Sequence, residues 1–388
     1  MRRRAGGQGM RVAAACLAGA LAASCSSDPA PPPPTPFAQA DCRGQLVEVA
    51  RFPSTDSPAP NAGTSNHLAT DGATLFLAYS NSRNDALVMT GLPSDGGVVA
   101  IPLSGAPTRV VAAADVPEWQ PGSFWVAGGQ VVVQTGTELA AVPADAATPG
   151  TVSAPAPDNR SAAYAHDAEF GYYAGPSGGT GVSVVKIPIG GGSPTALVYD
   201  LPGVTVGGMA DAGDALLLQV RWQRDPDESP FFRVWRVPKD GSPQTEVRID
   251  VRWADAARYP RLLVAWDGQD ILGPVTFDQG NVVVARVAPD GTSAPIPTRL
   301  AGSMVTRRGD EILSLQLVYG SGDPSPLLVV ASSQGDSAGT VLACGGEPAP
   351  FQTGAVGIPG PLGIAATDDD VYVAYTDGVD LVIARVAP

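Results

Sequence analysis

A repeat of about fifty residues is the feature that most limits what this chain can fold into. Residues 231–241 read FFRVWRVPKDG, a short alternation of apolar and polar side chains that runs into a turn. The same form returns about fifty residues later, at 283–291 (VVARVAPDG), and about fifty residues earlier, at 184–191 (VVKIPIGG). Alternating strands that end in turn residues at this period indicate small antiparallel sheets repeated around an axis.

The composition supports an all-β chain. The 388 residues include 46 glycines and 38 prolines, and aromatic residues make up only 6%. This balance favours many short strands with tight turns over helical bundles. No stretch after residue 30 has a sustained 3.6-residue apolar period. We therefore expect one large repeat architecture in place of two or three unrelated domains.

The net charge limits the possible partners. The formal charge at neutral pH is -14. A strongly acidic surface repels phosphate backbones and anionic lipid headgroups, so we expect no nucleic-acid partner. The charge is compatible with a cationic ligand, but a role in solubility alone is the simpler explanation and the one we favour.

The N-terminus predicts a secretory signal peptide over residues 1–24. Four arginines precede an apolar run, residues 12–23, that is too short to span a bilayer. The run ends LAASC, and small residues before a cysteine resemble the processing box of bacterial lipoproteins. This resemblance implies that Cys25 becomes the lipidated first residue of the mature protein. The alternative is an ordinary secretory signal with an unmodified Cys25.

Residues 25–41 predict a tether between this lipidated cysteine and the folded body, residues 42–388. Six prolines between residues 29 and 36 favour an extended polyproline conformation that cannot pack a core. At roughly 3 Å per residue, the tether would hold the body some 40 Å from the membrane. In lipoproteins a non-acidic residue after the modified cysteine implies export to the outer membrane, and Ser26 fits that rule. We expect the protein on the periplasmic side of that membrane or on the cell surface.

Seven units of one plan follow the tether. Each has an inner strand, a first turn, a second strand, a loop, a third strand, a second turn and an outer strand. The first turns are expected at Asp71-Gly72, Gly128-Gly129, Asp167, Gly213-Asp214, Asp267-Gly268, Gly309-Asp310 and Asp368-Asp369. The second turns are expected at Asp95-Gly96, Asp145, Gly190-Gly191, Asp240-Gly241, Asp290-Gly291 and Gly335-Asp336, and the seventh unit lacks one.

The last unit needs an outer strand from elsewhere in the chain. Residues 384–388 (ARVAP) repeat residues 285–289, so the chain stops where the other units turn into their outer strand. Residues 45–52 (QLVEVARF) alternate like a strand and have no sheet of their own. We expect this N-terminal strand to complete the C-terminal sheet, because pairing removes an open edge and closes the ring.

This plan resembles a β-propeller, similar to lipid-anchored and secreted bacterial propellers with irregular blades. The resemblance covers residues 42–388 and implies an all-β fold of seven four-stranded blades, with six or eight as the alternatives. It specifies little about function, because propellers include enzymes, ligand binders and scaffolds.

Cysteine positions predict one disulfide. Cys16 lies in the signal peptide and Cys25 carries the lipid, which leaves Cys42 and Cys344. Export to an oxidising compartment permits a bond between them, and outer strands of neighbouring blades lie close enough. Two free thiols are the alternative, and a metal site needs more ligands than these two.

We find no catalytic motif and predict no cofactor or metal. His67 and His166 are the only histidines, and we expect structural or solvent-exposed roles for both. The segment Thr367-Asp368-Asp369-Asp370 has closely spaced oxygen-bearing side chains, as a calcium-binding loop does, but we interpret it as a turn.

Two unusual segments predict a ligand-binding surface around the fourth and fifth units. They are residues 221–229 and residues 252–259, which should emerge on the same face. Tryptophan beside arginine and carboxylates is typical of binding surfaces for partners, sugars or cations. The candidate ligand-binding residues are Trp222, Arg224, Asp225, Asp227, Trp253, Arg258 and Tyr259; core packing of the two tryptophans is the alternative.

The leading hypothesis for function is an outer-membrane lipoprotein whose propeller binds or scaffolds an envelope protein or glycan, as a monomer. The alternative is a carboxylate-dependent propeller enzyme, such as a glycoside hydrolase or lyase. Two carboxylates that converge in a closed pocket with raised pKa values would favour the enzyme.

Overall fold

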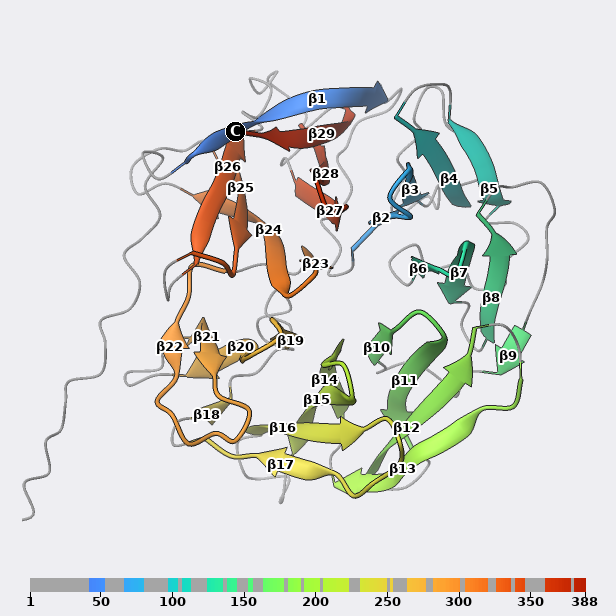
Figure 1. Ribbon diagram of the computed structural model, residues 1–388, viewed down its shortest axis with the longest axis vertical. Coiled ribbons are helices and arrows are strands. Elements are labelled where there is room, and N and C mark those ends of the chain that lie inside the picture. The colour runs from blue at the N-terminus through green and yellow to red at the C-terminus, as the bar shows by residue number, and fades with distance from the viewer. Residues whose placement is uncertain are drawn as a thin grey trace, which may run out of the picture. The chain divides into compact units, whose positions relative to one another are not determined.

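Every regular element in the described part of the chain is a β-strand (Figure 1). The computed structural model describes residues 42–52, 66–79, 97–103, 107–112, 124–134, 138–144, 153–155, 163–177, 181–189, 192–202, 205–222, 231–249, 252–253, 264–276, 282–300, 304–319, 326–335, 339–345, 360–377 and 380–388. These residues belong to one compact unit, residues 32–388. They include no helix with the length and apolar character of a membrane span.

The strands form blades of four antiparallel neighbours, named a to d from the centre outward. Blade 1 contains β2 (Leu68–Thr70), β3 (Thr74–Tyr79), β4 (Gly97–Pro102) and β5 (Thr108–Ala112). Blade 2 contains β6 (Phe124–Ala127), β7 (Gln130–Gln134), β8 (Glu138–Pro143) and β9 (Ser153–Pro155). Blade 3 contains β10 (Ala163–His166), β11 (Phe170–Pro176), β12 (Gly181–Pro188) and β13 (Thr195–Pro202).

The remaining strands continue the same order. Blade 4 contains β14 (Thr205–Asp211), β15 (Ala215–Trp222), β16 (Phe231–Pro238) and β17 (Thr245–Val247). Blade 5 contains β19 (Ala265–Trp266), β20 (Ile271–Thr276), β21 (Val282–Val287) and β22 (Ile296–Pro297), and β18 (Arg252–Trp253) bridges blades 4 and 5. Blade 6 contains β23 (Met304–Arg308), β24 (Glu311–Tyr319), β25 (Pro326–Ser332) and β26 (Thr340–Gly345). Blade 7 contains β27 (Gly360–Ala366), β28 (Val371–Thr376), β29 (Leu381–Ala387) and β1 (Gly44–Phe52).

The N-terminal strand β1 completes the last blade, as the sequence predicted. It runs antiparallel to β29, from the pair Gln45–Ala387 to the pair Phe52–Leu381. In Figure 1 the blue β1 lies beside the red β29 at the point where the two ends of the colour series meet. The all-β propeller closed by its N-terminal strand is therefore confirmed.

The blades hold together because alternate residues of one strand face different neighbours. In β3, Leu75 and Leu77 enter a buried cluster with blade 7, whereas Phe76 enters a cluster with blade 2. Strands that are buried on both faces therefore read as continuous apolar runs. Complete burial of one such side chain stabilises the fold by about 1.5–3 kcal/mol.

Each junction between blades has its own apolar cluster. The described residues form seven of them, which join blades 1–2, 2–3, 3–4, 4–5, 5–6, 6–7 and 7–1. The cluster between blades 7 and 1 joins residues from opposite ends of the folded body, such as Leu68 and Ile383. The series of sheets consequently closes into a ring.

The turns between strands a and b lie on the same face as the turns between c and d. In blade 4 the backbone N–H of Lys239, in the c–d turn, donates to the carbonyl of Asp214, in the a–b turn (2.9 Å). Blades 2 and 3 have equivalent bonds, from Ala144 to Gly129 and from Ile189 to Glu169. We call this side of the ring the turn face and the opposite side the loop face.

Cys42 and Cys344 form a disulfide, as the sequence predicted. Their Cα atoms are 5.6 Å apart, and 302 positions separate them in sequence. Cys344 lies in β26 of blade 6, so the bond connects the start of β1 to the neighbouring blade.

Candidate functional site

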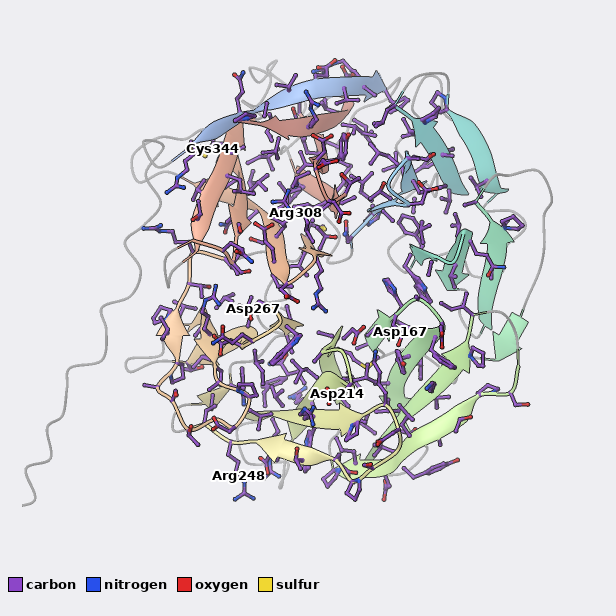
Figure 2. The ribbon with its side chains drawn as sticks, in the orientation of Figure 1. Asp167, Asp214, Arg248, Asp267, Arg308 and Cys344 are labelled. Carbon is purple, nitrogen blue, oxygen red and sulfur yellow. A yellow bond between two sulfur atoms is a disulfide. The ribbon has the colours of Figure 1, made fainter. Side chains whose placement is uncertain are left out.

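A pocket of about 630 Å³ lies on the turn face, against the a–b turns of blades 6, 7, 1 and 2. Figure 2 shows Arg308, which belongs to its wall, at the inner margin of the ring. The lining residues are Thr70, Asp71, Gly72, Leu103, Val126, Ala127, Gly128, Gly129, Arg307, Arg308, Gly309, Ala366, Thr367, Asp368, Asp369, Asp370 and Tyr372. Four blades therefore build one concave, polar site.

Side-chain oxygens at the end of strand a fix the acidic turns of this wall. In blade 1, Oδ1 of Asp71 accepts the backbone N–H groups of Ala73 (2.9 Å) and Thr74 (2.8 Å). In blade 7, Oγ1 of Thr367 accepts the N–H groups of Asp369 (3.3 Å) and Asp370 (2.9 Å). These turns are stable because short oxygen-bearing side chains satisfy backbone donors locally.

Both cations of the pocket are neutralised by carboxylates of their own turn. Nη2 of Arg307 lies 3.1 Å from Oδ1 of Asp310, and Nη2 of Arg308 lies 2.7 Å from Oε2 of Glu311. The other oxygen of Glu311 accepts a hydrogen bond from Ser332. The blade 6 wall consequently contributes little net positive charge to the pocket.

The acidic side of the pocket is only partly compensated. Asp370 faces Arg385 (3.6 Å) and accepts the hydroxyl of Tyr372 (3.3 Å). Burial and the nearby Asp370 carboxylate raise the pKa of Tyr372, so this phenol is neutral at neutral pH. Asp368 and Asp369 are exposed, and their carboxylates have no partner among the described residues. The pocket therefore carries net negative charge and favours a cationic group.

A second charged cluster on the turn face joins blades 3 and 4. Nζ of Lys239 lies 2.8 Å from Oδ2 of Asp167 and 2.8 Å from Oδ1 of Asp211. Burial alone would raise the pKa of Asp167, but hydrogen bonds from Lys239 and Tyr172 outweigh it and hold that pKa well below its usual range. These groups satisfy one another, which is typical of a structural cluster.

The described carboxylate pair that most resembles an acid–base pair is Asp267 and Asp270 in blade 5. Burial and the neighbouring Asp267 raise the pKa of Asp270. However, Oδ1 of Asp267 accepts the N–H groups of Gln269 and Asp270, and Oδ2 accepts a hydrogen bond from Arg286. Arg286 also donates to the carbonyl of Ser333 in blade 6, so the group connects two blades. The hydrogen bonds of Asp267 and Arg286 therefore support a structural role for the Asp267–Asp270 pair.

Most of the sequence-predicted ligand residues lie outside the described residues. These are Arg224, Asp225, Asp227, Arg258 and Tyr259, for which the binding surface stays a prediction. Trp222 is the last residue of β15 and pairs with Phe231 across the ladder. Cys25, the predicted lipidation site, also lies outside the described residues.

Trp253 is buried, which agrees with the core-packing alternative and not with a place in a ligand-binding surface. It is 5% exposed in the cluster between blades 4 and 5, and its indole N–H donates to the carbonyl of Val247 (3.3 Å). A Cβ atom at Gly273 would lie 2.9 Å from Cζ3 of Trp253, so only glycine leaves room for the ring. A glycine inside an apolar strand was the sequence signal for this close approach.

Each of the two histidines contacts a residue of the propeller blades. Nδ1 of His67 lies 3.2 Å from the carbonyl of Ala78 within blade 1. The ring of His166 stacks on Trp125 of blade 2, with centroids 5.2 Å apart and planes 5° apart. In the described ranges, no group of three or more His, Cys, Asp or Glu residues is arranged to hold a metal ion.

The turn-face pocket could not be predicted from the sequence, because each inner turn is a local feature and the pocket needs the turns of four blades. Thr367 to Asp370 form a turn, as interpreted from the sequence, and only the ring brings this turn beside those of blades 1, 2 and 6. The run of three aspartates at 368–370 was the available signal.

Comparisons with known proteins agree on the fold. No family model matches the sequence, and no curated protein is significantly similar to it. The β-propeller domain of the Trilobed protease from Pyrococcus furiosus, which has an open velcro topology, is 10% identical with a TM-score of 0.52. The match covers 86% of this chain and 96% of that domain.

A puromycin-hydrolyzing peptidase from Mycobacterium tuberculosis is also similar in structure. It is 15% identical with a TM-score of 0.50, and the match covers 86% of this chain but only 52% of the peptidase. At these identities the comparisons show a β-propeller fold and leave the function to the site.

Proposed function

We propose that the mature protein is a binding module of the bacterial outer membrane, anchored by a lipid on Cys25 and held away from the bilayer by the proline-rich tether. Its propeller binds a basic segment of an envelope protein at the turn-face pocket. The N-terminal sequence supports the location, because an apolar run that ends in LAASC precedes a proline-rich segment.

The observation that carries the binding role is the concave pocket with uncompensated carboxylates. Arg307, Arg308 and Asp370 each have an ionic partner, whereas Asp368 and Asp369 have none among the described residues. A lysine or arginine side chain of a partner supplies the missing charge and fits a volume of about 630 Å³. The acidic character of the whole chain attracts the same partner at longer range.

A pair of charge-matched variants tests this function. The double variant D368N/D369N removes the unpaired carboxylates, and D240N/D290N removes two other exposed aspartates, from the c–d turns of blades 4 and 5. Each changes the net charge by the same amount. Asparagine retains an oxygen for the turn bonds, so both variants should fold as the parent does.

The measurement combines cross-linked pull-down from envelopes with titration of a fluorescent lysine-rich peptide. We expect D368N/D369N to weaken peptide binding at least fivefold and to lose the specific partner, while D240N/D290N keeps both. Equal effects of the two variants would exclude the pocket and leave only a diffuse charge effect. Failure of all forms to bind any partner would refute the binding function itself.

A further inference from the structure

The N-terminal strand β1 is fastened more weakly by side-chain packing than the strands around it. Phe52 is its one side chain below a tenth exposed, at 6%, whereas Val47 and Val49 are 39% and 40% exposed. In contrast, its partner β29 buries four consecutive side chains, from Leu381 to Ala384. Leu46 and Ala50 pack only partly buried against the neighbouring clusters, so the ladder to β29 and the disulfide supply much of what holds β1 in place.

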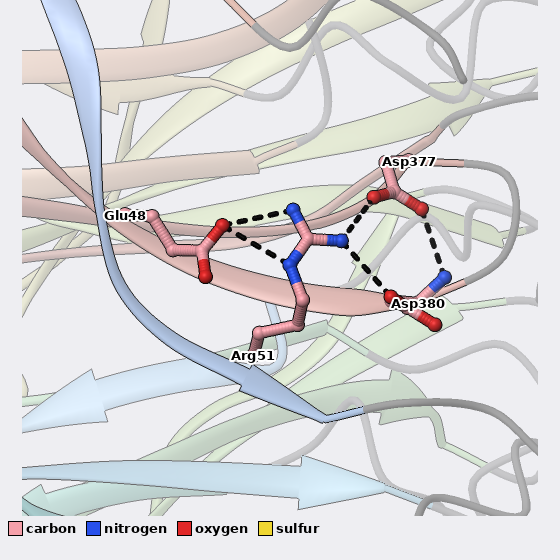
Figure 3. A network of polar contacts seen from close by, with 4 residues as sticks. All are labelled: Glu48, Arg51, Asp377 and Asp380. Atoms are coloured by element: carbon pink, nitrogen blue, oxygen red, sulfur yellow. Dashed lines mark hydrogen bonds and ion pairs between the residues drawn. The ribbon is translucent and has the colours of Figure 1, made fainter. Parts of the chain in front are cut away.

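The two ends of β1 are attached to different blades. At its start, Gly44 and Gln45 pair in parallel with Ala343 and Cys344 of blade 6, beside the disulfide. At its end, Arg51 binds Glu48 of β1 itself (2.8 Å) and Asp377 and Asp380 of blade 7 (Figure 3). Nη1 of Arg51 lies 2.5 Å from Asp377 and 3.0 Å from Asp380. This arginine side chain is 37% exposed, so solvent weakens the ionic clamp.

The passage of β1 between blades 6 and 7 is narrow. A Cβ atom at Gly44 would lie 2.1 Å from the carbonyl oxygen of Ala387 and 2.9 Å from that of Leu342. Among the described residues the ladder between β1 and blade 6 has two residue pairs, and Leu46 packs beside it against the cluster between blades 6 and 7, so the disulfide reinforces a short attachment. The disulfide lies at the start of β1, beside its short ladder with blade 6.

We propose that the Cys42–Cys344 disulfide is a redox latch for the ring. In the oxidised protein the disulfide attaches the start of β1 to blade 6, and the chain continues from its end into blade 1. Because both ends are attached, β1 cannot leave blade 7. After reduction, β1 detaches as a local event and opens the ring beside β29, while the other blade junctions keep their apolar clusters. The inference does not depend on the proposed binding function.

The chemical step needs a reductant of the dithiol class. One thiolate of the dithiol attacks a sulfur of the disulfide and expels the other cysteine as a thiolate, which takes up a proton. The second thiol of the reductant then attacks the mixed disulfide, forms the reductant's own disulfide and expels the second cysteine as a thiolate, which is also protonated. Two cysteine thiols form as the dithiol is oxidised to its own disulfide. Cys42 and Cys344 are both partly exposed, so a reductant can approach the bond.

Opening would expose a strand edge. Without β1, the outer edge of β29 has unpaired backbone groups from Leu381 to Ala387, and Phe52 no longer covers the cluster between blades 7 and 1. Such an edge accepts another extended strand. In the oxidised ring this edge stays occupied.

Hydrogen–deuterium exchange of the folded mature protein, before and after treatment with dithiothreitol, tests the latch. We expect backbone amides of residues 44–52 and 381–387 to exchange at least tenfold faster after reduction. Amides of β15 and β16 in blade 4 should exchange at an unchanged rate, because their contacts do not involve β1. The double variant C42S/C344S should show the fast pattern without reductant and no response to it.

Two outcomes would overturn the proposal. Unchanged exchange in β1 after confirmed loss of the disulfide would show that the ladder holds the strand unaided. Equal acceleration in blade 4 would show global loosening in place of a local opening. Reduction of the already folded parent avoids any dependence on whether the cysteine variant folds, and the oxidised variant Arg51→Met should keep the slow pattern because its latch is intact.

Discussion

The junction between blades 7 and 1 differs from the junction between blades 3 and 4 in how it is fastened. Both bury an apolar cluster of the same kind. The 3–4 junction joins neighbours in sequence and adds one lysine, Lys239, between Asp167 and Asp211. The 7–1 junction joins the two ends of the folded body. In blade 7, the disulfide and the ion pairs of Arg51 also hold the N-terminal strand β1 in place.

Asn66 adds a further fastening at this closing junction. Its Oδ1 accepts the N–H of Ile364 in β27 (2.8 Å), and its Nδ2 donates to the carbonyl of the same residue (2.7 Å). Apolar packing is repeated at each described junction, and polar contacts also cross junctions between sequence neighbours, such as Arg286 between blades 5 and 6. The disulfide, in contrast, lies beside the strand that closes the ring, where no short connection holds the blades together. Long-range closure costs more chain entropy, and specific contacts offset it.

The variant Asn66→Ala tests this comparison with the largest expected effect. It leaves both backbone groups of the fully buried Ile364 without the side chain that satisfies them. We expect a loss of about 1–3 kcal/mol in the free energy of unfolding, measured by urea denaturation under non-reducing conditions. A loss below about 0.5 kcal/mol would show that the junction does not need this residue.

The variant Lys239→Met should have a smaller effect, about 1–2 kcal/mol at neutral pH, because it removes one cation from two carboxylates. The pH dependence has a defined sign. The folded-state pKa of Asp167 is lowered, so its stabilisation is present above the unfolded value of about 3.9 and is lost as the pH falls below it.

Urea denaturation of parent and Lys239→Met across pH 2.5–7 measures this difference. The difference between the two stability curves should shrink as the pH falls from about 4 toward 2.5, because Asp167 of the unfolded chain becomes protonated there while the lowered pKa keeps folded Asp167 charged. Curves that stay parallel to the lowest pH would show that Lys239 stabilises the junction through its alkyl chain and not through its charge.

The variant Arg51→Met should have the smallest effect, about 0.5 kcal/mol, because its ion pairs are partly exposed. Hydrogen bonds to Glu48 and Asp377 raise the pKa of Arg51, so the arginine is charged at every accessible pH and the effect should not depend on its titration. Without it, three carboxylates repel one another. Added salt should therefore reduce the difference in melting temperature between variant and parent. A difference that does not depend on salt would contradict an electrostatic clamp.

Much of the fold could be predicted because its signals are local. The turns at Asp71-Gly72, Asp167 and Gly309-Asp310 follow from residues that favour turns, and the alternation of 45–52 predicts a strand. The missing outer strand of the last unit then required β1 beside β29. The pairing of Cys42 with Cys344 was predicted from the same closure, on the expectation that Cys16 belongs to a signal peptide and Cys25 carries a lipid.

The candidate site was harder to predict because its residues come from four blades. The sequence left Trp253 open between a binding residue and a core residue, and the structure decides for the core, because β18 lies between two sheets and Gly273 makes room for the ring. Arg308 gave no sequence signal at all, although it lines the pocket and binds Glu311. Contacts between distant residues depend on the ring and not on local preference.

By itself, the sequence determined the repeat, the strands with their turns, and the need for a borrowed strand, because these follow from side-chain alternation and turn chemistry within about ten residues. Only the tertiary structure decided which turns meet around the pocket, which charges cancel there and which tryptophan is buried. The physical reason is that charge pairing and burial depend on distances across blades, and a linear pattern does not contain those distances.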